Sequence, residues 1–182
     1  MTRRLVGYAR RVTAFRSRNH SVATVPVAPE AIWAVLTDSE LLARLTPLVD
    51  RIVPSDDRWV WTLAGISGLG LDVAPTFTER MTFVPISRID FQHEPPPGSN
   101  ERAGVNGTYQ ITRVGDSSSK LRIDLSLCVE LPLPSFSRRA VERIMAATMQ
   151  RTGDAFARNL YRHLDIDPTS VSIRVIDGDD AD

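Results

Sequence analysis

The clearest pattern of apolar and polar positions in the chain lies in residues 120–131, where the two kinds of side chain alternate. The apolar set is Leu121, Ile123, Leu125, Leu127, Val129 and Leu131, and the opposite set is Lys120, Arg122, Asp124, Ser126, Cys128 and Glu130. A period of two is that of a β-strand, and such alternation is typical of a sheet with one buried and one solvated face. Residues 103–114 predict a second long strand, and residues 115–119 predict the hairpin turn between the two.

Weaker patterns divide the rest of the chain into shorter elements. Residues 29–36 predict a helix, because Pro29 suits a first turn and the apolar side chains that follow share one face. A second short helix is expected at residues 40–45, and Pro47 ends it. Strands are expected at residues 20–27, 58–64, 71–84 and 86–93, and turns or loops at residues 65–70 and 95–98.

Residues 137–164 predict a long helix with Ser137 as its cap. One face of this helix mixes apolar and small polar side chains: Val141, Met145, Thr148, Met149, Thr152, Phe156, Asn159, Leu160 and His163. The opposite face is mostly charged. The mixed face leaves two interpretations open: a packed core whose threonines bond to backbone carbonyls one turn earlier, or the lining of a cavity.

The order of these elements predicts an α+β fold. One strand, two short helices, a run of antiparallel strands and a long C-terminal helix do not form a βαβ series. A curved antiparallel sheet of about seven strands has one apolar face to cover, and only the last helix is long enough to cover it. We expect the sheet to wrap around this helix and to leave between them a pocket of the kind that binds small molecules.

Residues 25–38, VPVAPEAIWAVLTD, resemble the opening strand and helix of the START-like superfamily, also called SRPBCC or helix-grip. Lipid-transfer START domains, polyketide cyclases and the birch pollen allergen family share that fold, and the resemblance covers residues 19–164. It implies a helix-grip fold with a cavity for a hydrophobic ligand. Residues 41–47, LLARLTP, are similar to a passage in the carbon monoxide dehydrogenase-related proteins of this superfamily, which implies membrane association and quinone-type ligands.

Charge is balanced overall, with 22 basic and 22 acidic residues, so no net field attracts nucleic acid. It is uneven along the chain, which predicts a basic arm at residues 1–18, a ligand-binding domain at residues 19–164 and an acidic tail at residues 165–182. On a helical wheel the arm is amphipathic, which leaves open a partly ordered extension or a helix on an anionic membrane. We expect a cytoplasmic protein, either free or peripheral at the inner membrane surface, because no apolar run approaches the length of a membrane span.

Strand parity places Glu79 among the apolar residues of the predicted inner face. A carboxylate buried there would have a raised pKa and could fix a ligand hydroxyl or act as a general base, unless a bulge turns it outward or it lies at the cavity mouth. His93 and Tyr109 share the inward parity and are the other acid–base candidates, although each also suits a strand end or a core position. The residues expected to contact a ligand are Trp59, Trp61, Phe77, Glu79, Met81, Phe91, Tyr109, Met145, Thr148, Met149, Thr152 and Phe156.

The sequence contains no pattern typical of a metal centre or of a nucleophilic active site. Its three histidines lie in separate predicted elements, and the single cysteine, Cys128, lacks a matched base, so we expect no metal and no cofactor. The leading hypothesis is non-catalytic binding or transfer of a lipophilic small molecule, such as a lipid, an isoprenoid quinone or a polyketide, by a monomer or homodimer. The alternatives are a polyketide cyclase or dehydratase using Glu79, His93 or Tyr109, and a protein-interaction or regulatory module using the charged ends.

Overall fold

An eight-stranded antiparallel sheet forms the body of the protein, in the strand order β10-β1-β9-β8-β7-β6-β3-β2. The computed structural model describes residues 12–68 and 71–175. The sheet strands are β1 (Thr13–Val25), β2 (Val49–Ser55), β3 (Arg58–Leu63), β6 (Thr76–Val84), β7 (Arg88–His93), β8 (Ala103–Gly115), β9 (Ser118–Leu131) and β10 (Ser172–Val175). Strands β4 (Ile66–Gly68) and β5 (Leu71–Val73) pair separately. The helices are α1 (Pro29–Thr37), α2 (Ser39–Leu45) and α3 (Arg138–His163), with short 3-10 turns η1 (Ser135–Ser137) and η2 (Pro168–Ser170).

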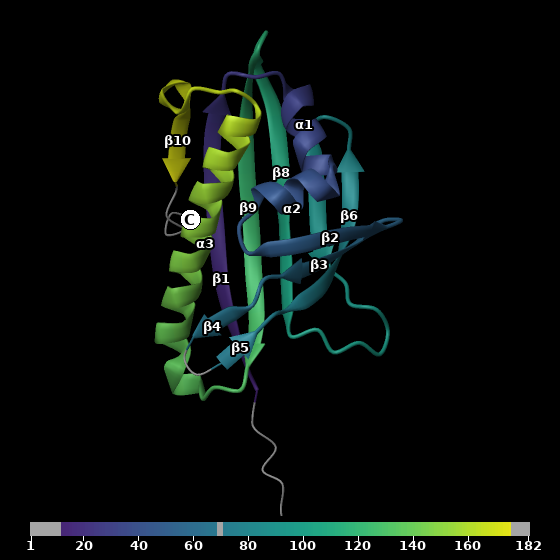
Figure 1. Ribbon diagram of the computed structural model, residues 1–182, viewed down its shortest axis with the longest axis vertical. Helices are drawn as coiled ribbons and strands as arrows, with labels where there is room; N and C mark the ends of the chain where they lie inside the picture. Colours follow the sequence, from purple (N-terminus) through teal and green to yellow (C-terminus); the bar gives the residue numbers. More distant parts are fainter. Residues whose placement is uncertain (1–11, 69–70, 176–182) are drawn as a thin grey trace, which may run out of the picture.

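The sheet curls around the long C-terminal helix, as the sequence predicts. Helix α3 runs alongside β1, while α2 and the β2–β3 hairpin cross in front of β8 and β9 (Figure 1). Two hydrogen bonds fix α3 at its ends. Near its start the Arg138 guanidinium donates to the Ala14 carbonyl at 3.1 Å, and near its end the Asn159 amide donates to the Leu45 carbonyl at 2.9 Å. The helix-grip architecture is therefore confirmed.

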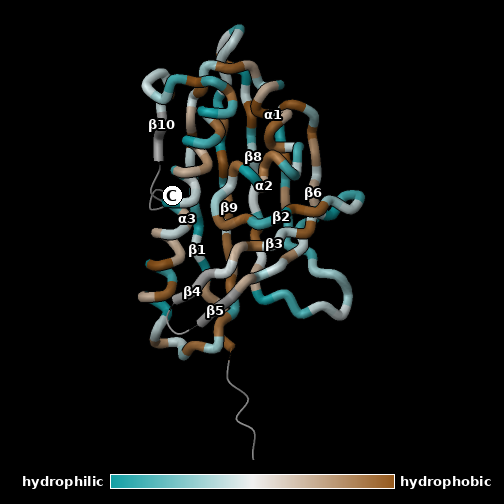
Figure 2. Tube along the Cα trace, in the orientation of Figure 1, coloured by the Kyte–Doolittle hydropathy of each residue, from teal (hydrophilic) through white to brown (hydrophobic). Residues whose placement is uncertain are grey.

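Helices α1 and α2 each begin at a residue that favours a helix N-terminus, and each has one apolar face that is buried. Pro29 begins α1, and Ile32 and Leu36 from its inner face are fully buried. The Asp38 side chain accepts a hydrogen bond from the Leu41 backbone N–H at 2.9 Å and so caps α2. Hydrophobic positions recur along α1, whereas the loop between β7 and β8 is hydrophilic (Figure 2).

Burial differs between the elements that line the interior. Beneath α1, Leu42, Ile89 and Leu160 are fully buried in the main core. Phe15 on β1 and Val141 on α3 are also buried. By contrast, the apolar side chains that β9 directs inward at positions 123, 125, 127 and 129 are only partly buried. The inner face of β9 is therefore covered less completely than the strands that carry the main core.

Four local predictions were wrong. The strand expected at residues 71–84 is divided into β5 and β6, and residues 66–68, expected in a turn, form β4. Strand β2 was not expected at all. Ser137 does not cap α3, because its hydroxyl donates to the Pro134 carbonyl at 2.7 Å instead.

Both charged ends contribute strands to the sheet. Residues 13–18, expected within an amphipathic arm, form the start of β1 and pair with β9, so a helix over them is wrong. The remainder of that expected helix, in residues 1–11, lies outside the described residues. At the other end, Ile166 is buried, and β10 pairs with β1 from Ser172 to Val175. The last seven residues of the expected acidic tail also lie outside the described part.

Candidate functional site

Among the residues whose burial the structure describes, one carboxyl group, that of Glu79, is buried on the inner face of the sheet. Strand β6 pairs in unbroken register with β7 at this point, where Glu79 lies opposite His93, and Trp59 on β3 lies opposite Glu79 on the other side. Phe77 and Met81 on the same face are also buried, and only 2% of Glu79 is exposed. The bulge that would turn Glu79 outward is therefore absent from this strand pair, and parity assigned its direction correctly.

Burial controls the charge of this carboxyl group. Its Oε2 atom has no hydrogen-bond partner among the described residues, and desolvation raises the pKa of Glu79 from 4.5 to about 8. The indole N–H of Trp61 opposes this shift, although Trp61 Nε1 is itself buried and lacks a partner that meets hydrogen-bond geometry. Glu79 is thus mostly protonated at pH 7.

Aromatic side chains surround the carboxyl group. Trp61 stacks on Phe77 with ring centroids 6.1 Å apart and planes 6° apart, and Trp59 lies 6.5 Å from Trp61. On the adjacent strands the centroids of Phe91 and Tyr109 are 5.0 Å apart. Burial and the nearby Glu79 charge together raise the pKa of Tyr109 well above its ordinary value, so this phenol remains neutral. This aromatic wall therefore carries three polar groups that are uncharged at neutral pH: the Glu79 carboxyl group, the Trp61 indole N–H and the Tyr109 phenol.

The third acid–base candidate, His93, engages a carboxylate that the sequence does not point to. Its Nε2 atom lies 3.0 Å from Glu101 Oε2, in the loop between β7 and β8. Glu101 also accepts hydrogen bonds from the Thr78 backbone N–H at 2.8 Å and from the Thr78 hydroxyl at 2.7 Å. Gly104 makes room for the histidine, because a Cβ at that position would lie 2.3 Å from the ring. The structure therefore places Glu79 and His93 opposite each other, but joins His93 to Glu101.

Helix α3 contributes the remaining candidates, and their burial differs along the helix. Phe156 belongs to the main core with the aromatic candidates of the sheet. Four others are only partly buried: Met145, Thr148, Met149 and Thr152. This stretch of α3 lies against β1, since a Cβ at Gly153 would lie 3.6 Å from the side-chain amide nitrogen of Asn19. The residues expected to contact a ligand therefore divide into core members and partly exposed members.

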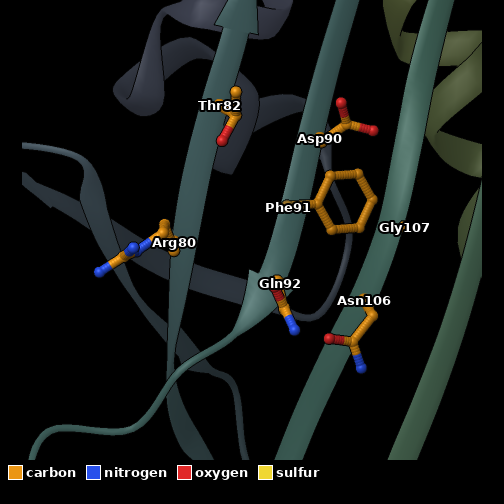
Figure 3. A pocket seen from close by; sticks show the side chains of 7 residues that line it. All are labelled: Arg80, Thr82, Asp90, Phe91, Gln92, Asn106 and Gly107. Atoms are coloured by element: carbon orange, nitrogen blue, oxygen red, sulfur yellow. The ribbon is translucent and has the colours of Figure 1, made fainter.

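Two grooves formed by the described residues are open to the outside, and neither is lined by α3. The first, about 540 Å³, is lined by residues of β6, β7 and β8, among them Phe91 and Gly107, which lie side by side on β7 and β8 (Figure 3). Its other lining residues are polar: Arg80, Thr82, Asp90, Gln92 and Asn106. The second, about 470 Å³, lies between α2 and β2.

No group of three or more histidine, cysteine, aspartate or glutamate side chains suited to a metal ion occurs in residues 12–68 and 71–175. No helix in those same ranges is long and apolar enough to cross a bilayer.

Comparison with known proteins supplies the family. A family model described as polyketide cyclase / dehydrase and lipid transport matches residues 17–165, which is most of the chain. The chain belongs to this polyketide cyclase / dehydrase and lipid transport family. No curated protein sequence matches the chain. The family assignment confirms the START-like resemblance of residues 19–164 and a fold used for ligand binding.

Solved structures with the same fold have sequences that are only distantly similar to this chain. The Zhui aromatase/cyclase from Streptomyces sp. R1128 is 13% identical, with a TM-score of 0.58 over 85% of this chain and 94% of that one. A START superfamily protein from Mycobacterium smegmatis is 15% identical, with a TM-score of 0.58 over 80% and 98%. A conserved protein from Geobacillus kaustophilus is 13% identical, with a TM-score of 0.59 over 86% and 99%. At these identities the similarity establishes the fold alone.

Proposed function

We propose that the protein binds and transfers a lipophilic small molecule between α3 and the inner face of the sheet, without catalysis. The observation that carries this proposal is the incomplete burial of inward apolar side chains on β9 and α3. A ligand that covered these side chains would gain roughly 25 cal/mol for each Å² of apolar surface removed from water. Lipids, isoprenoid quinones and polyketide-like molecules all supply such surface.

The partly buried side chains on the inner face of α3 suit a ligand of irregular shape. Met145 and Met149 are unbranched and polarizable, so they adapt to a guest more readily than branched side chains do. Thr148 and Thr152 add hydroxyl groups among them. The family's association with polyketides and lipid transport is consistent with this type of ligand.

Filling the space tests the proposal. We expect Met145→Trp and Met149→Trp to abolish the retention of a co-purified lipophile, measured by native mass spectrometry, while the circular dichroism spectrum stays unchanged. Ala147→Trp, on an exposed position of the same helix, is the matched control and is expected to retain the lipophile. Retention by both methionine variants at the level of the control would contradict the proposal.

A second candidate function, that of a polyketide cyclase or dehydratase, is favoured by the His93–Glu101 pair. These side chains are within hydrogen-bond reach, as a general acid–base pair requires, and His93 lies opposite Glu79 in the strand register. Turnover of a synthetic linear poly-β-ketone thioester to a cyclic product would test it. We expect His93→Ala and Glu79→Gln to lower turnover if the protein is such an enzyme. Unchanged turnover in both variants, or no turnover by the wild type, would contradict this function.

We also propose that the basic N-terminal segment brings the protein to an anionic membrane surface. Residues 1–11 contain four arginines and no acid, and β1 begins next to η1, since the Thr13 hydroxyl donates to the Leu133 carbonyl at 2.7 Å. Phe136 in η1 is 88% exposed, so an aromatic ring is available on the surface close to the start of β1. Removing residues 1–11 leaves β1 intact and is expected to reduce sedimentation with phosphatidylglycerol vesicles without changing ligand uptake. Equal sedimentation of the full-length and truncated proteins would contradict this contact.

A further inference from the structure

Two polar atoms on the inner face lack partners, and they lie on neighbouring strands. Trp61 Nε1 on β3 and Glu79 Oε2 on β6 are both buried, and neither has a partner of ordinary hydrogen-bond geometry among the described residues. The indole N–H nevertheless lies near enough to the carboxyl group to oppose the rise in the pKa of Glu79. Strands β3 and β6 pair directly, with Trp59 opposite Glu79 and Trp61 opposite Phe77, so both side chains emerge on the same face. Buried polar atoms in folded proteins nearly always have partners, and those that do not call for an explanation.

The donor and acceptor properties of these two atoms determine which hydrogen-bond partner each of them requires. The indole N–H only donates, so its partner must be an acceptor. The Glu79 carboxyl accepts when ionised, and when protonated it both donates and accepts. A hydroxyl group is the simplest uncharged group that meets both needs, because its oxygen accepts from Trp61 while its hydrogen is donated to Glu79.

We infer that Trp61 and Glu79 form the recognition point for an uncharged hydroxyl group on the lipophilic ligand, such as the alcohol or phenol of an otherwise apolar molecule. This inference rests on the proposed binding function. It narrows the ligand class from any lipophile to hydroxyl-bearing ones, and it excludes a carboxylate or phosphate as the group placed at this point.

The surroundings of Glu79 support the exclusion of anions. None of the hydrogen-bonded ion pairs in the described residues includes Glu79, and the side chain opposite it, His93, directs its Nε2 atom to Glu101. Tyr109, the other titratable group close to Glu79, remains a neutral phenol. An anionic headgroup would therefore be buried beside a carboxyl group without a compensating cation, which is strongly unfavourable.

A thermodynamic cycle with isosteric probes tests this recognition. Naphthalen-2-ylmethanol and 2-ethylnaphthalene have nearly the same shape, but only the first carries a hydroxyl group. Isothermal titration calorimetry would give the affinity of both probes for the wild type, Glu79→Leu and Glu79→Gln. Glu130→Leu, on an exposed position of β9, is the control.

We expect Glu79→Leu to shift the ratio of alcohol to hydrocarbon affinity by about tenfold or more toward the hydrocarbon, the usual cost of a buried polar group left unpaired. Glu79→Gln keeps a donor and an acceptor, so it should retain most of the wild-type ratio of alcohol to hydrocarbon affinity. The control Glu130→Leu should leave this ratio unchanged. A ratio that stays the same in Glu79→Leu would overturn the hydroxyl assignment while leaving the binding function intact. Failure of every probe to bind the wild type would overturn the binding function itself.

A second measurement does not depend on the folding of any variant. The wild type is expected to bind 2-naphthoate about tenfold or more weakly than naphthalen-2-ylmethanol, because the carboxylate would lie beside Glu79 without a cation. Equal or tighter binding of 2-naphthoate would overturn the inference, since it would require a cation at the site.

Discussion

Replacing Glu79 by glutamine gives the sharpest test of the interior described above, because it removes one ionisable group and little else. In the folded protein the carboxyl group holds its proton up to a pKa of about 8, whereas in the unfolded chain the proton is released near 4.5. Between these values the folded state binds more protons than the unfolded state. The free energy of unfolding must therefore fall as the pH rises through this window.

The expected size of this effect follows from the two pKa values. Each pH unit between 4.5 and 8 lowers the free energy of unfolding by about 1.4 kcal/mol, so Glu79 alone accounts for up to about 5 kcal/mol of lost stability across the window. Below pH 4.5 both states are protonated and the full stability is present; above pH 8 both are ionised and no further loss occurs. Glutamine has nearly the same shape and stays neutral, so this dependence disappears in the variant.

The assay is urea denaturation of the ligand-free wild type and Glu79→Gln at several pH values from about 5 to about 9, which span the folded-state pKa. We expect the variant to gain stability relative to the wild type steadily up to about pH 8, and the gain to level off above it. The exposed Glu130→Gln variant on β9 is the control, and its difference from the wild type should not change with pH in this way. A Glu79→Gln difference that is constant over the whole range would refute the argument that this carboxyl group is buried without a partner.

Three further predictions concern the structure around the site. Gly104→Ala places a Cβ 2.3 Å from the His93 ring, so the ring must move, and we expect a loss of about 1–3 kcal/mol in urea denaturation; an unchanged midpoint would contradict this. Glu101→Ala leaves the buried Thr78 backbone N–H without its acceptor and should cost about 1–3 kcal/mol, with faster amide hydrogen exchange at Thr78 as its local signature. Asp38→Ala removes the cap of α2 and should lower the free energy of unfolding by ~1 kcal/mol; thermal unfolding identical to the wild type would argue against the cap.

The parts of the fold that the sequence predicts well are those whose side chains repeat with a clear period. Strands β8 and β9 pair over nearly their whole length, as expected for two long strands joined by a hairpin turn. Strand β2 escaped prediction because it lies at the edge of the sheet and contains Pro54, and only Ile52 among its side chains is buried. An edge strand pairs on one side only, so it tolerates a proline that would disrupt a central strand. Its sequence therefore carries little of the strand pattern.

The sequence predicts the part of the candidate site that follows from the alternation of side chains along a strand. It does not predict the part that depends on the path of a loop. The inward direction of Glu79 follows from its spacing to Phe77 and Met81 on one strand. The pairing of His93 with Glu101 does not follow from any local period, because the loop that carries Glu101 returns across the end of β7 to reach Thr78, 23 positions away in sequence. The order of the chain alone does not specify which carboxylate such a loop brings to a histidine.

The placement of the partly exposed region is a consequence of how α3 is held. The helix is fixed to β1 at its start through Arg138 and Ala14, and to α2 near its end through Asn159 and Leu45. Buried apolar side chains accompany each attachment: Phe15 and Val141 at the first, Leu42 and Leu160 at the second. Because these attachments hold the helix, the inward side chains of α3 between them can stay partly exposed. Under the proposed function, a lipophilic guest would cover this surface while both attachments stay in place, and its hydroxyl group would reach Trp61 and Glu79 in the adjoining core.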